Sequence, residues 1–390
     1  MPGFEKAIHT IFPSPKNRQT TTSRILPKSS HLVMPLARRL NELRTILEAS
    51  NLDAMLVSFL PNIRYLTGFS GSNALCIVTM DRRYFLSDGR YRDQARAERR
   101  GFRVFITSRG LIEEASRLNL LKGSKRVGIE SQHLPVATLQ NLRRHFRSVR
   151  FVSTRSLVEN IAAIKDEQEI DLIRHAVAIT DKVFKKILSV VKPGLSELDL
   201  AAEIGYYHRK FGAEAEAFET IVASGPHGAF PHARPTERRI RRGDLVTLDF
   251  GCRFRGYHSD LTRTIAVGNP SPLARRIYAI VLDAQLRAIE AARSGVAAKE
   301  VDGVARKHIK RNGFGKYFNH SLGHGLGLQI HETLRLSALS KDVLRSGNVV
   351  TVEPGIYIPG VGGVRIEDDV VIRDGHCDIL NTSTKELIVL

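Results

Sequence analysis

Long hydrophobic runs are missing from this sequence of 390 residues. No stretch approaches the roughly 18–20 apolar residues that a membrane-crossing helix needs, so we expect no membrane span. Cysteine is sparse as well: Cys76, Cys252 and Cys377 are odd in number and far apart. That scattering argues against a disulfide framework and against the paired spacing of a structural zinc site. It favours a reducing compartment, and we expect a cytoplasmic protein.

Acidic residues are in the minority, because 40 Asp and Glu stand against 59 Lys and Arg, a formal charge of +19. Such a balance can indicate an anionic partner such as nucleic acid. However, the basic clusters at 99–100, 143–144 and 238–242 lack the interleaved aromatic residues of a single-strand binding groove. We therefore favour a solvated, arginine-rich surface, and nucleic acid is a minor hypothesis. The length is sufficient for two globular domains.

Residues 1–33 differ from the rest of the chain, since they are rich in Ser, Thr, Pro, Lys and Arg and contain Glu5 as their only acidic residue. We predict a disordered basic extension here. It lacks the continuous apolar core of a secretory signal. Its composition also fits an organelle transit peptide, and Met34 offers a second start, so both interpretations stay open.

Residues 34–158 form a predicted α/β domain. A helical stripe of leucines opens it at positions 36, 40, 43 and 47. Short apolar runs then alternate with helical patterns. The predicted strands are 54–59, 74–80, 83–86, 103–107, 127–130 and 149–152, and the predicted helices are 91–99 and 134–146. This half contains no set of candidate ligands, so we expect it to serve substrate access, specificity or assembly.

Residues 159–390 form the second predicted domain, in which one arrangement occurs twice. A helix over 166–191 is followed by a second helix that ends near 212 and begins at Ser196, which has the spacing of a capping box. Downstream, helices over 273–292 and 299–311 repeat this order. Both helix pairs lead into strand-rich segments. This favours a degenerate duplication and a pseudo-twofold domain with a site at its centre.

Five side chains able to bind metal ions lie in the strand-rich segments. They are Asp249, Asp260, His324, Glu353 and Glu367. Taken singly, an aspartate can cap a turn, a glutamate can lie at a strand end and a histidine can be structural. Together, four carboxylates repel one another unless cations lie among them, and two divalent ions supply the needed charge. The set predicts metal-dependent hydrolysis at a two-metal site.

The local sequence predicts how these residues are presented. Residues 244–267 indicate a β-hairpin, so that Asp249 and Asp260 fall on adjacent strands and can share a metal. Glycines on both sides of His324 permit unusual dihedral angles and close approach of the backbone. The two glutamates each follow a short apolar strand. Because the ligands are mostly hard oxygen donors, Mn²⁺ is the favoured ion, with Co²⁺ or Zn²⁺ as alternatives.

The five ligands, in this order and with these flanking residues, resemble those of the pita-bread metallopeptidases, and within them the proline-specific Xaa-Pro aminopeptidases and Xaa-Pro dipeptidases. The resemblance runs from about Met34 to Leu390. Residues 65–71 and 88–91 are similar to the amino-terminal domain of aminopeptidase P and creatinase relatives. Creatinase lacks the metal ligands, whereas this chain has all five. The resemblance implies an α/β (α+β) fold, with a creatinase-like N-terminal α/β domain followed by a pseudo-twofold pita-bread catalytic domain.

The resemblance also implies how the ligands divide between two ions. Asp249 and Asp260 would hold one metal, with Asp260 bridging. His324 and Glu353 would hold the other, and Glu367 would bridge. Glu353 would also act as the general base that handles the proton of the bridging water.

Three residues outside the ligand set gain roles from the same resemblance. His232 and His331 match two histidines that would contact the substrate and stabilise charge on the scissile carbonyl oxygen. Either histidine could instead be held in the core or in hydrogen bonds behind the ligands. Arg365 would pair with the carboxylate cluster.

We predict a metal-dependent aminopeptidase that hydrolyses the N-terminal Xaa-Pro bond of peptides with proline at the second position. The nitrogen of that bond has no N–H, so catalysis needs a proline pocket, electrophilic metals and protonation of the leaving nitrogen. An Xaa-Pro dipeptidase (prolidase) is the alternative, and it needs a clamp for the free carboxylate. A non-catalytic pita-bread binding protein is a further alternative, against which the five retained ligands argue. Relatives with this amino-terminal domain are often dimers, so we expect a homodimer.

Overall fold

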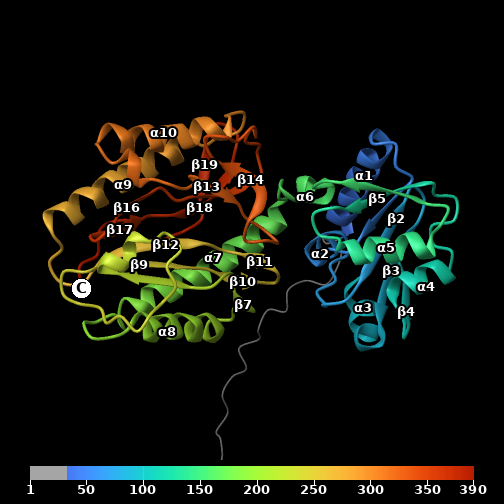
Figure 1. The fold of residues 1–390 in the computed structure, drawn as a ribbon, viewed down its shortest axis with the longest axis horizontal. Helices are drawn as coiled ribbons and strands as arrows, with labels where there is room; N and C mark the ends of the chain where they lie inside the picture. Colours follow the sequence, from blue (N-terminus) through green and yellow to red (C-terminus); the bar gives the residue numbers. More distant parts are fainter. Residues whose placement is uncertain (1–32, 100) are drawn as a thin grey trace, which may run out of the picture.

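A computed structural model describes residues 33–99 and 101–390. The chain forms two lobes joined by a short connection around α6 (Leu157–Ala162), as Figure 1 shows. The predicted disordered extension lies outside the described residues, except for Val33, which is the first residue of α1. The domain boundary that we placed after residue 158 falls inside α6.

The amino-terminal lobe is built on a six-stranded sheet in the order β4-β3-β2-β1-β5-β6. All six predicted strands are confirmed, because short β-branched and aromatic runs pair well on a pleated surface. Pairing is parallel except that β2 runs antiparallel to both β1 and β3. The strands are β1 (Ala54–Val57), β2 (Leu75–Thr79), β3 (Arg83–Asp88), β4 (Arg103–Thr107), β5 (Arg126–Glu130) and β6 (Arg150–Thr154).

Helices cover both faces of this sheet, and their apolar sides form two core clusters. The predicted leucine stripe is confirmed, since Leu40, Leu43 and Leu47 of α1 are buried in the core of this lobe. Three short helices, α2, α4 and α6, were not predicted. The helices are α1 (Val33–Ala49), α2 (Leu60–Thr67), α3 (Arg92–Glu98), α4 (Leu111–Arg117) and α5 (Val136–His145), with the 3₁₀ turn η1 (Gly89–Tyr91).

The second lobe begins with two helices that both start at a capping box. Asp166 accepts from the Glu169 amide ahead of α7, and Ser196 accepts from the Asp199 amide ahead of α8. Such caps satisfy the free amides of the first turn and fix where each helix starts. The helices of this lobe are α7 (Glu167–Ile187), α8 (Glu197–Lys210), α9 (Pro272–Ala291) and α10 (Ala298–Arg311), with the 3₁₀ turns η2 (Gly225–Ala229) and η3 (Gly315–Tyr317).

Strands of the second lobe form a layer between the two helix pairs (Figure 1). One core packs α7 and α8 against the sheet β12-β9-β8, and another packs α9 and α10 against β14, β15 and β18. The strands are β7 (Ala215–Glu216), β8 (Ile221–Ser224), β9 (Leu245–Phe250), β10 (Cys252–Phe254), β11 (Tyr257–His258), β12 (Leu261–Ala266), β13 (Gly323–Gly325), β14 (Glu332–Leu336), β15 (Val349–Val352), β16 (Gly355–Ile358), β17 (Gly362–Arg365), β18 (Asp368–Ile372) and β19 (Cys377–Ile379).

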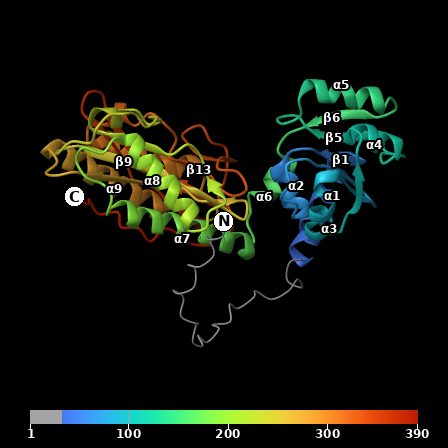
Figure 2. The same cartoon turned by 90° about the horizontal axis from the view of Figure 1, so that it is seen from below.

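The repeated order of helix pair and strands confirms the predicted pseudo-twofold architecture. Each half supplies a sheet whose inner strands meet at the centre of the lobe, so polar residues from both halves converge there. Figure 2 shows the same lobe from below, with α7 and α8 in front of the strands. Within the described residues, no helix has the length and apolar character needed to cross a membrane.

Candidate metal centre and active site

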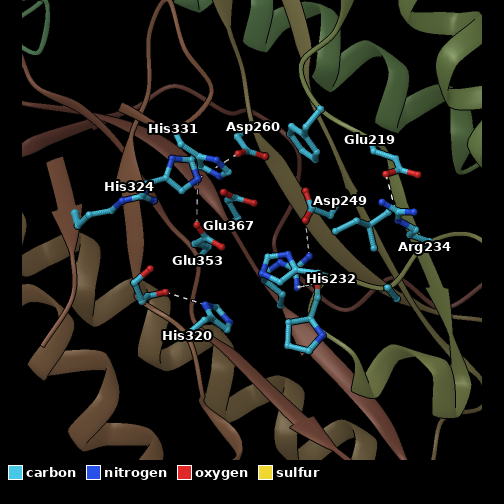
Figure 3. Close-up of a pocket in the computed structure, with 17 residues that line it drawn as sticks. Glu219, His232, Arg234, Asp249, Asp260, His320, His324, His331, Glu353 and Glu367 are labelled. Carbon is cyan, nitrogen blue, oxygen red and sulfur yellow. Dashed lines mark hydrogen bonds and ion pairs between the residues drawn. The ribbon is translucent and has the colours of Figure 1, made fainter. Parts of the chain in front are cut away.

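A single cavity of about 560 Å³ in the second lobe brings the predicted site residues together (Figure 3). It is lined by all five candidate ligands and by His232, His331 and Arg365. Residues more than 100 positions apart therefore share one site. Their roles as ligands and substrate contacts stay predictions.

The two aspartates come from the β9–β12 region, in a geometry that corrects one expectation. Asp249 lies in β9, but its cross-strand partner is Thr262. Asp260 precedes β12 instead of lying within it, because the small hairpin β10–β11 occupies the segment between the long strands. The Asp260 amide donates to Asp369 Oδ2 at 2.9 Å. That bond holds the bend, so Asp260 reaches the cavity from a strand end.

His324 sits in β13, with Nε2 directed at the carboxylates of Asp260 and Glu353, at 3.6 Å and 3.4 Å. Its Nδ1 lies 3.1 Å from the Gly325 carbonyl, which can only accept a hydrogen bond. Nδ1 therefore carries the proton, and the lone pair of Nε2 faces the cluster, as a metal ligand requires. Burial lowers the pKa of His324 to about 3, which keeps the ring neutral.

The glycines beside His324 serve close packing. Neither Gly323 nor Gly325 has a positive φ, so the dihedral freedom that glycine permits is not used there. A Cβ on Gly323 would collide with the Thr351 carbonyl oxygen on the neighbouring strand. Glycine thus lets β13 lie close enough for the His324 amide to donate to Thr351 Oγ1 at 3.0 Å.

The two glutamates follow strand ends, as predicted. Glu353 comes directly after β15 and accepts from Thr351 Oγ1 at 3.0 Å. Glu367 lies between β17 and β18 and accepts from Thr262 Oγ1 at 2.6 Å. Each threonine therefore fixes one carboxylate oxygen. In Glu353 this oxygen also faces His324 Nε2, whereas in Glu367 the other oxygen, Oε1, is buried without a hydrogen-bond donor in the described part of the chain.

Electrostatics set these carboxylates apart from ordinary surface acids. Burial, followed by repulsion from Glu367 and Asp249, raises the pKa of Asp260 well above its usual range. Burial, followed by repulsion from Glu353 and Asp249, does the same to Glu367. Burial also raises the pKa of Glu353 to about 7. A cluster of this kind is unfavourable without cations among its members.

The unpaired oxygens test whether metal ions fit. Among the described residues, no hydrogen-bond donor reaches Asp249 Oδ1, Asp260 Oδ1 or Glu367 Oε1, although all three atoms are buried. Ligand atoms of Asp260, His324 and Glu367 lie within 4.8 Å of one another. Buried acceptors without donors, facing a common space with an imidazole lone pair, fit divalent cations with oxygen-rich coordination.

Arg365 is the cation that the chain itself places in the cluster. Its side chain is 3% exposed, and its guanidinium pairs with Asp249 and donates to Thr262 Oγ1 at 3.0 Å. It also donates to the Tyr357 hydroxyl at 2.7 Å, and that hydroxyl lies 2.9 Å from His320 Nε2. This geometry agrees with the expected pairing of Arg365 with the carboxylates, and it extends the network to His320.

The two other predicted histidines face the same cavity from opposite sides. His331 packs edge-on against His324, with 4.3 Å between ring centroids. His232 follows Pro231, whose carbonyl accepts from Arg365 at 3.2 Å. Figure 3 shows His331 beside His324, and His232 below Asp249.

Comparison with known proteins agrees with this geometry. Residues 171–374 match Metallopeptidase family M24, and residues 39–164 match the Creatinase/Prolidase N-terminal domain. The chain belongs to metallopeptidase family M24. An Xaa-Pro dipeptidase of Pyrococcus horikoshii is 38% identical to this M24 chain, over 88% of the chain and 96% of the relative.

Two solved structures resemble the M24 chain over most of its length. An Xaa-Pro dipeptidase from Bacillus anthracis superposes with a TM-score of 0.89 at 38% identity, covering 91% of this chain and 100% of that one. An X-Pro aminopeptidase from Thermotoga maritima superposes with a TM-score of 0.83 at 34% identity, covering 87% and 98%. The resemblance stated from the sequence motifs is therefore confirmed at the level of family and fold.

Sequence reasoning missed several residues of this M24 site. His320 and Tyr357 had no signal, because neither lies in a motif and they meet only through the fold. Arg335 did have a signal in the sequence. Side chains alternate along a strand, so residues 331, 333 and 335 share a face, and Arg335 falls on the same side as His331. The burial of β14 follows that alternation, and Arg335 lines the cavity on the side of His331. Its guanidinium pairs with no carboxylate in the described part of the chain.

Proposed function

We propose that this chain is a dinuclear metal-dependent peptidase that hydrolyses Xaa-Pro dipeptides. The general chemistry is supported by the five ligand-type residues and two histidines on one cavity. The choice of dipeptides is supported by Arg335, the cavity-lining guanidinium that has no acidic partner among the described residues. Two relatives with the name Xaa-Pro dipeptidase, from Pyrococcus horikoshii and Bacillus anthracis, point in the same direction.

The residues divide the reaction among them. Two divalent ions, when bound, supply polarisation of the scissile carbonyl and activation of a water molecule. Glu353 would hold one ion and also accept a proton from the water whose oxygen bonds to the scissile carbonyl carbon. It would then pass that proton to the proline nitrogen as the C–N bond breaks. His232 and His331 donate hydrogen bonds to the charge that develops on the carbonyl oxygen. Arg365 holds Asp249 in place.

The cavity offers complementary surfaces to both parts of the substrate's proline residue. Phe218, Ile221, Pro231 and Ala233 line it with apolar side chains that suit the pyrrolidine ring. Arg335 presents a planar, fixed positive charge that suits the free carboxylate of a dipeptide. A longer peptide replaces that carboxylate with an amide and leaves the guanidinium without an ionic partner. This is the clamp that the dipeptidase alternative requires.

The aminopeptidase predicted from the sequence is the second candidate. It is favoured by the likeness to the X-Pro aminopeptidase from Thermotoga maritima. The two candidates share the metal chemistry and differ in whether the substrate ends at proline.

The test compares an Ala-Pro dipeptide with an Ala-Pro-Pro tripeptide and an Ala-Ala dipeptide, using protein stripped by a chelator and reloaded with Mn²⁺, Co²⁺ or Zn²⁺. We expect metal-dependent cleavage of Ala-Pro, with Mn²⁺ the most effective ion because the donors are mostly oxygen. Preferred cleavage of Ala-Pro-Pro would establish the aminopeptidase. Cleavage of neither proline peptide by metal-loaded protein would refute the proposal. Cleavage is expected to be lost in His324→Ala and kept in His376→Ala, which removes an exposed histidine outside the cavity. The homodimer and the cytoplasmic location stay predictions.

A further inference from the structure

Strand β14 directs its residues alternately into the cavity side and into the protein. Glu332, Leu334 and Leu336 are buried, whereas Thr333 and Arg335 are exposed. Glu332 therefore points away from the cavity although it directly follows His331. A buried carboxylate next to a substrate-contacting residue needs a partner.

That partner is Lys165, which lies 167 positions earlier in the sequence. Lys165 Nζ forms an ion pair with Glu332 Oε2. Both side chains are buried, with 2% of the Lys165 side chain and 7% of the Glu332 side chain exposed. Lys165 Nζ also lies 3.3 Å from the Ala163 carbonyl oxygen. Replacing such a pair by apolar residues is often neutral or stabilising, so its stability contribution alone does not account for it.

The second oxygen of Glu332 holds the loop between His324 and His331. Glu332 Oε1 accepts from the Leu328 amide at 3.1 Å. A Cβ on Gly327 would collide with the same oxygen and would lie 2.9 Å from Lys165 Cε. From the other side, the His258 amide donates to the Gly327 carbonyl at 2.9 Å. The loop is thus fixed between the hairpin that precedes Asp260 and the Lys165–Glu332 pair.

Lys165 itself is fixed by the connection between the lobes. Its amide donates to the Gly347 carbonyl at 2.8 Å, and Asn348 Nδ2 donates to the Ala163 carbonyl at 2.8 Å. The residue falls between the two segments matched by the family descriptions, 39–164 and 171–374. Leu328, at the centre of the loop, packs against the apolar core of the amino-terminal lobe. Both sides of the pair therefore meet where the lobes join.

We propose that Lys165 and Glu332 are positioning residues that hold the loop over residues 325–331, and thereby the His331 ring, in the orientation that catalysis needs. The inference rests on the proposed role of His331. The pair acts through this histidine, and it ties the orientation of the ring to the connection between the lobes. Misplacement of a substrate-contacting group by about 1 Å can lower the rate by up to about 100-fold.

The test replaces both charges at once with the near-isosteric neutral pair Lys165→Met/Glu332→Gln, so that no buried charge is left alone. In metal-loaded protein we expect kcat on Ala-Pro to fall by about 10-fold to 100-fold while two ions per chain remain bound. Hydrogen–deuterium exchange is expected to rise in residues 326–331. If the neutral pair does not fold, Glu332→Asp keeps the charge, shortens the reach, and carries the same expectations.

A double-mutant cycle separates positioning from general destabilisation. In a His331→Ala background, the neutral pair is expected to lower kcat by less than about twofold, because the group it positions is gone. An equal loss in both backgrounds, or no loss with His331 present, would overturn the proposal.

The matched control is Arg39→Met/Glu169→Gln. Arg39 and Glu169 also form a largely buried ion pair between the lobes. Their side-chain hydrogen bonds go to Tyr65, Asp166 and Tyr257 and not to the 325–331 loop. This control is expected to lower Tm while leaving kcat within about twofold. The control variant could instead lower kcat as much as the Lys165→Met/Glu332→Gln variant does, and only when His331 is present. In that case the effect would come from the docking of the lobes in general, and the assignment to Lys165 and Glu332 would fail. Absence of peptidase activity in wild-type protein would refute the proposed function instead. Hydrogen–deuterium exchange of residues 326–331 that is unchanged in the Lys165→Met/Glu332→Gln variant would then refute the positioning claim by itself.

Discussion

Replacing Arg335 by methionine tests the choice between a dipeptidase and an aminopeptidase. Methionine keeps much of the length of the side chain and removes its charge and its donors. The backbone of β14 is expected to be unaffected, because the contact of Arg335 with Asp342 is made by the main-chain amide. The change should therefore act on the substrate carboxylate and leave the fold intact.

The magnitude follows from the exposure of the group. A hydrogen bond to a charged partner contributes about 1.5–3 kcal/mol, whereas an ion pair in full solvent contributes about 0.2–1 kcal/mol. Arg335 is exposed at the cavity edge, so solvent screens part of its charge. We expect a loss of about 1–2 kcal/mol, equivalent to about 5–30-fold in kcat/KM for Ala-Pro. For Ala-Pro-amide, which has no carboxylate, we expect less than about a twofold change.

The assay measures kcat/KM for both substrates with wild-type protein, Arg335→Met and Arg234→Met. Arg234 lines the same cavity but is paired with Glu219, so it controls for a general loss of positive charge. An equal loss on Ala-Pro and Ala-Pro-amide would refute the clamp. A larger loss in Arg234→Met than in Arg335→Met would move the carboxylate site to the other arginine.

Three further outcomes follow from the structure. His324→Ala removes the imidazole donor and should lower bound metal and hydrolysis by more than about 100-fold, which elemental analysis and Ala-Pro cleavage check. Reloading chelated protein should raise Tm, since ligand at about 100 times Kd stabilises the folded state by about 2.7 kcal/mol; an unchanged Tm would contradict a preformed site. Burial lowers the pKa of His208 to about 4 in the folded protein. As the pH falls from 6.5 to 4, this histidine is protonated in the unfolded chain before it is protonated in the folded one. The free energy of unfolding should therefore fall by up to about 3 kcal/mol. In chelated protein, His208→Leu should remove that part of the pH dependence of the free energy of unfolding, measured by urea unfolding. Equal pH dependence in wild-type protein and His208→Leu would contradict this.

Local signals predicted much of the fold because they report on interactions between neighbours in sequence. The capping boxes at Asp166 and Ser196 are examples, since cap and partner amide are three residues apart. Leucine periodicity in α1 and the alternating strands of the amino-terminal lobe belong to the same class. The carboxylates of the site were also found this way, because four acids beside apolar strands are anomalous even before their partners are known.

Contacts between distant segments could not be predicted in the same way. Asp260 was expected on a strand, but its place is set by the Asp369 carboxylate, 109 positions away. The glycines around His324 were interpreted through dihedral freedom, although the reason for them is the approach of Thr351. Lys165 and Glu332 each look like ordinary charged residues in the sequence, and only the meeting of the two lobes buries them together.

The charge balance of the proposed two-metal centre gives Arg365 a purpose beside the ions. Four carboxylates bring four negative charges, and Arg365 compensates one of them through Asp249. Two divalent ions exceed the remaining three negative charges by one. With both ions bound, the proposed centre would be slightly positive, which would favour the negative charge that develops on a carbonyl oxygen during hydrolysis. Without Arg365 the same ions would only neutralise the carboxylates. In an Arg365→Met variant, kcat on Ala-Pro is therefore expected to fall by a larger factor than the number of metal ions bound per chain.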